Sequence, residues 1–168
     1  MAKRSLQIKT FTPTATADTT DLVDDTYFGV IQGGSSTQRV IISEIYLGGQ
    51  ATASAPTIMV LARDSTIAVT VSLGTNQTDA PLDSATAALA AATIVGNTAT
   101  TKPQRAATLS LLNVSFNAFG GIVRWVAADE KSSIMQAGNA VNLGETSLSA
   151  FTGGTPGLMG GHVIYEAL

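Results

Sequence analysis

His162 is the single histidine of the chain, and it stands at the start of a predicted C-terminal strand over residues 162–167. Nucleophilic catalysis by serine or threonine needs a base beside the nucleophile, most often histidine and in some enzymes lysine. Neither Lys102 nor Lys131 belongs to a recognisable serine–lysine motif, and the chain contains no cysteine. A lone histidine just after a glycine-rich turn is more typical of a hydrogen-bonded residue at a sheet edge or an interface. We therefore expect no catalytic triad.

Adjacent carboxylate pairs occur at Asp24-Asp25 and Asp129-Glu130, and such groups can perform acid–base catalysis. Neighbouring residues of a strand point to opposite faces, so neither pair forms a ready catalytic dyad. The acidic cluster Asp18–Asp25 offers oxygen ligands of the kind that Ca²⁺ prefers, but its spacing matches no EF-hand loop and suits a solvated acidic loop. We expect no catalytic residue, no metal and no cofactor, and the ion-binding alternative for this cluster stays open.

Glycines cluster near the end of the chain, where they could in principle cradle a phosphate; they lie at positions 153, 154, 157, 160 and 161. Phosphate loops of this kind lead into a helix, whose N-terminus binds the anion. Here a strand is expected to follow, and the chain has no Gly-Lys-Ser or Gly-Lys-Thr sequence. Tight turning or close backbone approach is the expected role of these glycines.

Short strands are the main elements that must position these residues, since β-branched and alternating segments are separated by glycine-rich or asparagine-containing turns. Strands are predicted over residues 5–11, 27–32, 38–47, 57–63, 66–73, 108–116, 122–127, 133–136, 146–151 and 162–167. One short helix is predicted over residues 79–95, with Pro81 in its first turn and an alanine-rich centre.

This pattern predicts a mainly β fold, a two-sheet β-sandwich of the jelly-roll or Greek-key type. We expect residues 1–25 to form an N-terminal strand and an extended arm, and residues 26–168 to form one domain.

Charge is scarce in this chain. Charged residues make up 12% of it, compared with about 25% in an average soluble domain. Long uncharged blocks result, at residues 45–62, 65–78, 84–101, 106–123 and 132–144. Protein interfaces are depleted of charge at their centres, so the scarcity indicates a surface that is largely covered by other subunits. A neutral surface of threonine, serine and alanine is the alternative.

Nucleic acid and membrane are not expected as partners. The net charge is −3, whereas nucleic-acid binding requires a basic stripe. Residues 1–10 begin with basic residues but have no apolar core of a secretory signal. The uncharged run at 84–101 contains few strongly apolar residues and would not insert into a bilayer.

Three segments of the C-terminal third carry a resemblance. They are Asn117–Trp125, with its pattern GG-x-x-R-W, then Asn142–Glu145, and finally Gly153–Glu166, with the pattern G-x-H-x-x-x-E. Together they resemble small structural proteins of tailed bacteriophages that sit on or near the capsid. The resemblance covers about fifty C-terminal residues, and the first hundred residues match only in their threonine- and alanine-rich style.

The resemblance implies a decoration, or cement, protein of the outer capsid surface, made in the host cytoplasm. Its partners would be the major capsid protein and further copies of itself, in a homotrimer. Another virion part, such as a tail or fibre component, and a carbohydrate-binding β-sandwich module are the alternatives. Residues from the basic N-terminus, the arginine–tryptophan strand and the last strand are the interface candidates: Lys3, Arg4, Leu6, Ile8, Arg124, Trp125 and His162. For Trp125, a place in the core is also expected.

Overall fold

The computed structural model describes residues 2–14, 27–33, 38–64, 71–86, 93–99, 104–129, 134–136, 145–152 and 156–168. The described residues contain strands and no helix. In chain order the strands are β1 (Lys3–Phe11), β2 (Tyr27–Gly33), β3 (Val40–Gly49), β4 (Pro56–Asp64), β5 (Val71–Ser72), β6 (Gln77–Pro81), β7 (Thr93–Gly96), β8 (Thr98–Ala99), β9 (Arg105–Asn117), β10 (Ile122–Val126), β11 (Ile134–Gln136), β12 (Glu145–Thr152) and β13 (Met159–Ala167).

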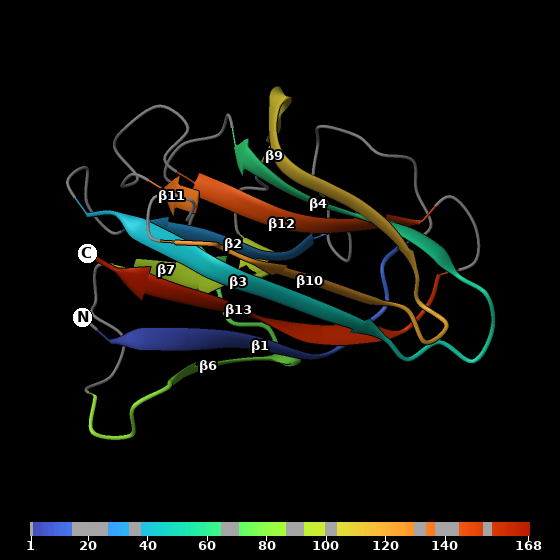
Figure 1. Cartoon of the computed structure of the whole chain (residues 1–168), viewed down its shortest axis with the longest axis horizontal. Helices are drawn as coiled ribbons and strands as arrows, with labels where there is room; N and C mark the ends of the chain where they lie inside the picture. Colours follow the sequence, from blue (N-terminus) through green and yellow to red (C-terminus); the bar gives the residue numbers. More distant parts are fainter. Residues whose placement is uncertain are drawn as a thin grey trace.

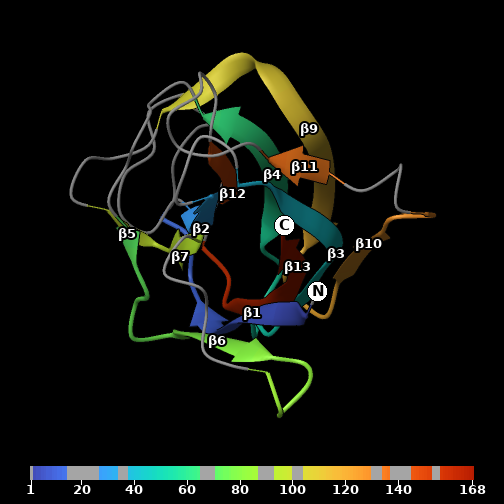
Figure 2. The same cartoon turned by 90° about the vertical axis from the view of Figure 1, so that its left-hand side faces the viewer.

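The strands form two larger sheets and one small one, and every described pairing is antiparallel (Figures 1 and 2). The first, sheet A, has the order β10-β3-β13-β1-β6, with β11 also paired to β3. The second, sheet B, has the order β7-β2-β12-β4-β9, and β5 pairs with β8. The last strand of the chain therefore lies in the middle of sheet A, between β1 and β3.

Four of the pairings are nested along the chain. The strand β1 pairs with β13, β2 with β12, β3 with β10, and β4 with β9. Successive strands of the first half alternate between sheets A and B, and the partner strands return in the reverse order. Nesting of this kind means that the chain forms one long antiparallel ribbon, whose far end is the β4–β9 pair.

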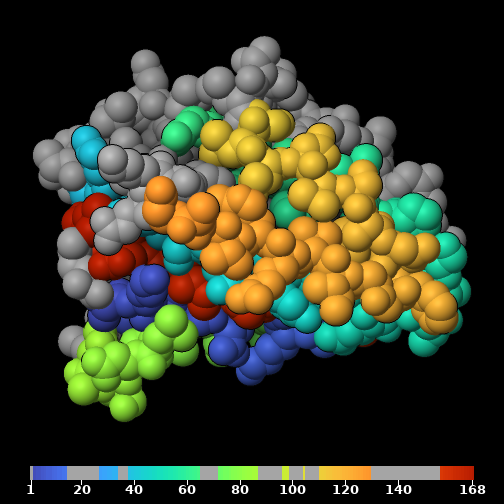
Figure 3. Space-filling model, in the orientation of Figure 1, coloured from blue at the N-terminus to red at the C-terminus, as the bar shows by residue number. Residues whose placement is uncertain are grey.

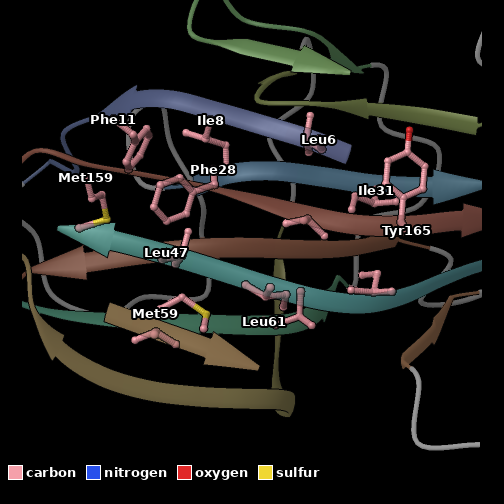
Figure 4. Close-up of a cluster of buried hydrophobic side chains, with 14 of the residues drawn as sticks. Leu6, Ile8, Phe11, Phe28, Ile31, Leu47, Met59, Leu61, Met159 and Tyr165 are labelled. Carbon is pink, nitrogen blue, oxygen red and sulfur yellow. The ribbon is translucent and has the colours of Figure 1, made fainter. Parts of the chain in front are cut away.

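The hydrophobic core takes side chains from both larger sheets (Figure 4). Alternation along β1 places Leu6 and Ile8 in the core, and a register irregularity after Ile8 brings Phe11 to the same side. The ring of Phe11 in sheet A meets that of Phe28 in sheet B, with ring centroids 4.4 Å apart. Burial of each such side chain stabilises the fold by about 1.5–3 kcal/mol.

The mainly β prediction is confirmed, and nine of the ten predicted strands overlap the strands β1, β2, β3, β4, β9, β10, β11, β12 and β13. Of the predicted strand 66–73, only Val71–Ser72 (β5) lies in a described strand, and residues 65–70 lie outside the described residues. Of the predicted N-terminal strand and arm, the structure describes residues 2–14. Residues 4–8 are paired on both sides within sheet A, with β13 and with β6, while residues 15–25, with the Asp18–Asp25 cluster, lie outside the described residues.

The helix predicted over residues 79–95 is wrong at both of its ends. Residues 79–81 belong to β6 and residues 93–95 to β7, whereas residues 87–92 lie outside the described residues. Helix propensity is a weak preference that tertiary pairing overrides. Here Asp79 of β6 pairs with Leu6 of β1. Its carboxylate accepts hydrogen bonds from Arg4 of β1 and from Tyr165 of β13.

Candidate functional site

One row of mostly polar side chains crosses all five strands of the main path of sheet A. Arg124 of β10 lies opposite Tyr46 of β3, and Tyr46 lies opposite His162 of β13. His162 in turn lies opposite Gln7 of β1, which lies opposite Thr78 of β6. These five residues, the polar row, are far apart in the sequence and become neighbours only through the register of four strand pairs.

Alternation places the polar row on the face of sheet A that is turned away from the core. Residues next to row members along the chain, namely Leu6, Ile45, Leu47, Val123 and Val163, are buried in the core. Successive side chains of a strand point to opposite faces, so the row must lie on the outer face. The side chains of Arg124 and His162 are 61% and 34% exposed, which leaves both accessible to a partner.

Glu44, two residues before Tyr46 on β3, holds two members of the row. Its Oε1 accepts a hydrogen bond from Arg124 Nε at 3.1 Å and lies 3.5 Å from His162 Nε2. Burial by itself opposes ionisation of this carboxyl, but hydrogen bonding and charge attraction from Arg124, with a smaller contribution from His162, lower the pKa of Glu44 below its ordinary value. Glu44 is therefore an ionised acceptor at neutral pH.

The rings of Tyr46 and His162 stack across β3 and β13. Their centroids are 5.4 Å apart and their planes are 12° apart. The stack restricts the rotation of both rings, and the contact with Glu44 further restricts that of His162, so these side chains are organised without a bound partner.

A hollow of about 450 Å³ lies next to the stacked rings on the outer face. Hydrogen-bonding side chains surround it: Gln7, Lys9, Tyr46, Gln50 and His162. Ile122 adds one apolar side, and glycines contribute much of the rest of the lining: Gly48, Gly49, Gly120, Gly160 and Gly161. A hollow of this volume is in the size range of ligand-binding sites.

Gly48 differs from its neighbour Gly49 in what a side chain would meet. A Cβ atom on Gly49 would collide with the backbone of Ala118, so close packing explains this glycine. A Cβ atom on Gly48 would approach only Tyr46, with Cε1 at the ordinary distance of 3.8 Å. Glycine inside a strand weakens it, and it often marks a place where a ligand or another backbone comes close. The absence of a side chain at Gly48 keeps the hollow open.

An apolar margin lies beside the polar row along β10. Ile122 is 63% exposed and Val126 is 50% exposed, with Arg124 between them, and Phe119 of the preceding turn is 59% exposed. Three of the seven exposed large hydrophobic side chains of the described residues thus gather in or beside one strand. Because exposed apolar groups gather here, this margin is a candidate interaction surface.

The structure brings some of the predicted interface residues together and separates others. Arg124 and His162 both contact Glu44 on the outer face. His162 lies in a central strand, so the sheet-edge alternative for this residue is wrong, and the interface alternative stays a prediction. Trp125 packs partly buried against the core, as expected for a core residue. Lys3 is exposed on β1.

Arg4, Leu6 and Ile8 are buried, with 7%, 1% and 3% of their surface exposed. Leu6 and Ile8 stabilise this chain's own core, so an interface role for them would require the sheet to open.

Two groups of residues could not be recognised in the sequence. Tyr46, Glu44 and Gln7 of the outer face lie in ordinary strand patterns, and no local signal marks them. The second group is the buried cluster of Arg4, Asp79 and Tyr165, which joins β1, β6 and β13.

Among the described residues, no group of three or more histidine, cysteine, aspartate or glutamate side chains is placed to hold a metal ion. No helix of the described part is long and apolar enough to span a membrane. Comparison of the chain with protein-family models, curated proteins and solved structures finds no match.

Proposed function

We propose that this chain is a non-enzymatic structural protein of a tailed-bacteriophage particle, which attaches to the outer capsid surface and stabilises the shell by bridging neighbouring capsid subunits. Further copies of the chain and the major capsid protein are its proposed partners. The proposal rests on the strand connectivity, the composition of the surface and the C-terminal resemblance.

The nested strand pairing is the observation that carries the proposal. A jelly roll is an antiparallel ribbon of eight strands, rolled up so that its strands alternate between two packed sheets. The four nested pairs have this connectivity, with β1, β13, β3 and β10 adjacent in sheet A and β2, β12, β4 and β9 adjacent in sheet B. Viral capsid domains and lectins are prominent users of the jelly roll. We therefore propose this fold for the chain, with β6 and β7 as additional edge strands.

The outer face of sheet A is the proposed attachment surface. It combines an apolar margin, the organised pair of Arg124 and His162 on Glu44, and a hollow that can receive a side chain of a capsid subunit. Protein interfaces have a similar composition: apolar, aromatic and arginine side chains anchor the contact, and few further charges are present. Bridging two capsid subunits adds buried area at a junction that internal DNA pressure would otherwise open.

Electron microscopy of the phage whose genome encodes this chain tests the proposal. Gold-labelled antibodies against the chain should mark the heads of wild-type particles and should not mark particles from a genome that lacks the coding sequence. Particles that lack the chain should also release their DNA at a lower temperature. Label on the tail would indicate that the chain is a tail component instead, and absence of label would refute the proposal.

A binding experiment tests the attachment surface. Purified protein is added to particles that lack it, and co-sedimentation measures the bound fraction. Gly48→Val fills the hollow and should weaken attachment, whereas Ser115→Val adds the same side chain to the exposed face of β9 and should leave attachment unchanged. Equal attachment of the two variants would exclude the hollow from the contact.

A saccharide-binding module is the second candidate, and the hollow is the observation that favours it. Gln7, Gln50 and Lys9 can bond to hydroxyl groups, while Ile122 can pack against the C–H face of a sugar ring. A glycan array with the purified protein tests this candidate. Binding that Gly48→Val abolishes would support it, and the absence of any bound glycan would reject it.

A further inference from the structure

The outer edges of the two larger sheets differ in how they are protected against pairing with another strand. Unpaired edges associate with other chains unless proline, charge, bulges or a covering segment prevents it. On sheet A, one edge is β6. Leu82 N–H donates to Lys3 O at 2.9 Å, so the next pair, Pro81 and Arg4, is a non-hydrogen-bonded pair. Pro81 therefore removes an N–H group from the open side of β6, as is typical of an edge strand.

The edges of sheet B have other protections. The carbonyl of Ser72 in β5 lies where a Cβ atom on Gly96 of β7 would be, so β5 adjoins that edge. The opposite edge, β9, has two register irregularities against β4. Its exposed side chains toward the turn include the polar Asn113 and Ser115.

The edge at β10 has no proline, bulge or covering strand among the described residues, and its one charged residue, Arg124, is paired with Glu44 of the neighbouring strand. Gly49 N–H donates to Gly121 O at 2.8 Å, and Ala127 N–H donates to Ser43 O at 2.9 Å. Facing residues of an antiparallel pair alternate between hydrogen-bonded and non-hydrogen-bonded, so the odd-numbered residues of β10 bond to β3. The even-numbered residues direct their N–H and C=O groups away from β3: Ile122, Arg124 and Val126. No described strand pairs with this side of β10, which lies on the face shown in Figure 3 (yellow to orange).

The side chains along this edge are symmetric about Arg124. Ile122 and Val126, both at least half exposed, stand two residues to either side of it. Only even-numbered residues offer backbone groups, so two antiparallel copies of β10 can pair in registers centred on Val123, Arg124 or Trp125. The register centred on Arg124 alone uses all three open residues and places Ile122 opposite Val126 at both ends.

We propose that the open edge of β10 pairs with β10 of a second copy of this chain, antiparallel and about a two-fold axis at Arg124. The two A sheets then form one continuous sheet across the dimer. The two Arg124 side chains face each other at the axis, where like charges would repel. Each is bound by its own Glu44 at 3.1 Å, so the centre contains two guanidinium groups and two carboxylates and carries no net charge.

A five-residue edge buries less surface than the roughly 1,200–2,000 Å² of a stable interface. The dimer should accordingly be weak and concentration-dependent in solution. Copies held side by side on a larger assembly would pair far more completely, because their effective concentration is high. The inference concerns the free protein and does not depend on the proposed attachment to a capsid.

Sedimentation equilibrium of the purified protein, from micromolar to millimolar concentration, measures the association. The wild type should shift from monomer toward dimer. Val126→Lys should weaken the dimer at least about tenfold, because each substitution acts twice across the axis and adds charge to an apolar pair. Leu82→Lys, at a site 58% exposed on the opposite edge of sheet A, is the matched control and should leave association unchanged. Circular dichroism confirms that both variants fold.

Glu44→Gln tests the position of the axis. It leaves both Arg124 charges without a counter-charge and should weaken the dimer most at low salt, whereas Glu44→Gln combined with Arg124→Gln should restore it. A monomer at every concentration would overturn the proposal. A trimer, the state that the phage resemblance implies, would also overturn the proposal if Val126→Lys left the stability of the trimer unchanged. Neither outcome would affect the antibody labelling of particles, so the two proposals fail separately.

Discussion

The buried carboxylate of Asp79 joins three strands of sheet A, and its removal should destabilise the protein more than loss of an exposed ion pair. Its Oδ2 accepts hydrogen bonds from Arg4 Nε and Nη2 at 2.9 and 2.7 Å, and its Oδ1 accepts one from the Tyr165 hydroxyl at 2.8 Å. The side chains of Arg4 and Asp79 are only 9% and 5% exposed. Burial, with the adjacent carboxylate, raises the pKa of Tyr165 above its ordinary value, so this hydroxyl stays a donor.

The expected loss for Asp79→Ala is about 3 kcal/mol of unfolding free energy. Removal of one partner of a buried ion pair costs about 3–5 kcal/mol, and hydrogen bonds to charged groups contribute about 1.5–3 kcal/mol. We take the low end of the ion-pair range because the cluster adjoins the edge strand β6, where water can reach Arg4 after small movements. For a chain of this size the loss corresponds to a fall in Tm of about 6–12 °C.

A double-mutant cycle in urea measures the interaction. Arg4→Met and Asp79→Leu should each destabilise the protein, because each leaves one charge without its partner. The double variant should recover most of the loss, since well-packed apolar residues can replace a buried ion pair at little cost. Tyr165→Phe supplies the matched control for the third hydrogen bond. If Asp79→Ala costs less than about 1 kcal/mol, the value of an exposed pair, then solvent screens the cluster and the reasoning is refuted.

Two further predictions concern residues of β3. Gly49→Ala should destabilise the protein by about 1–3 kcal/mol, because its Cβ collides with the backbone of Ala118. Gly48→Ala should change stability by less than about 0.5 kcal/mol. The midpoints of urea unfolding of the two variants test this difference. Glu44 has a lowered pKa in the folded state, chiefly because attraction to Arg124 outweighs burial. Its stabilisation is therefore complete above its unfolded pKa of about 4.5 and disappears as pH falls through the lower folded value. The stability difference between wild type and Glu44→Gln should be a few tenths of a kcal/mol at pH 7, because the pair is so exposed. This difference should vanish on acidification. A difference that grows in acid would contradict the assigned contact.

The strands could be predicted because their signals are local. Alternation in β1, the apolar run in β4 and the glycine-rich turns each depend on a few neighbouring residues. The helix prediction failed for the same reason. An alanine-rich segment behind Pro81 has a local preference for helix, but residues 79–81 lie within reach of β1, and Arg4 supplies the charge that Asp79 needs. Local preference cannot register a partner that is 75 residues away.

The candidate site could not be predicted because it depends on register. The polar row joins residues 7, 46, 78, 124 and 162 through four strand pairs, and a slip of one residue in any pair would move a row member out of line and toward the core face. Arg124 and His162 were recognised as candidates from their residue type. Glu44 and Tyr46, which hold them in place, had no distinguishing signal.

The pairing register of sheet A therefore decides both which side chains enter the core and which lie on the outer face, and this register depends on β13. This strand is the last of the chain, yet it lies between β1 and β3. Its odd-numbered Val163 and Tyr165 enter the core, while the even-numbered His162 joins the polar row. Neither β1 nor β3 can complete its pairing before β13 arrives, so sheet A closes through contacts about 160 residues apart in sequence, such as Lys3 with Glu166. Contacts of this separation make folding slow. The same strand pairing that buries Val163 also brings His162 to Glu44 and Tyr46, so the proposed attachment surface forms only when the core is closed.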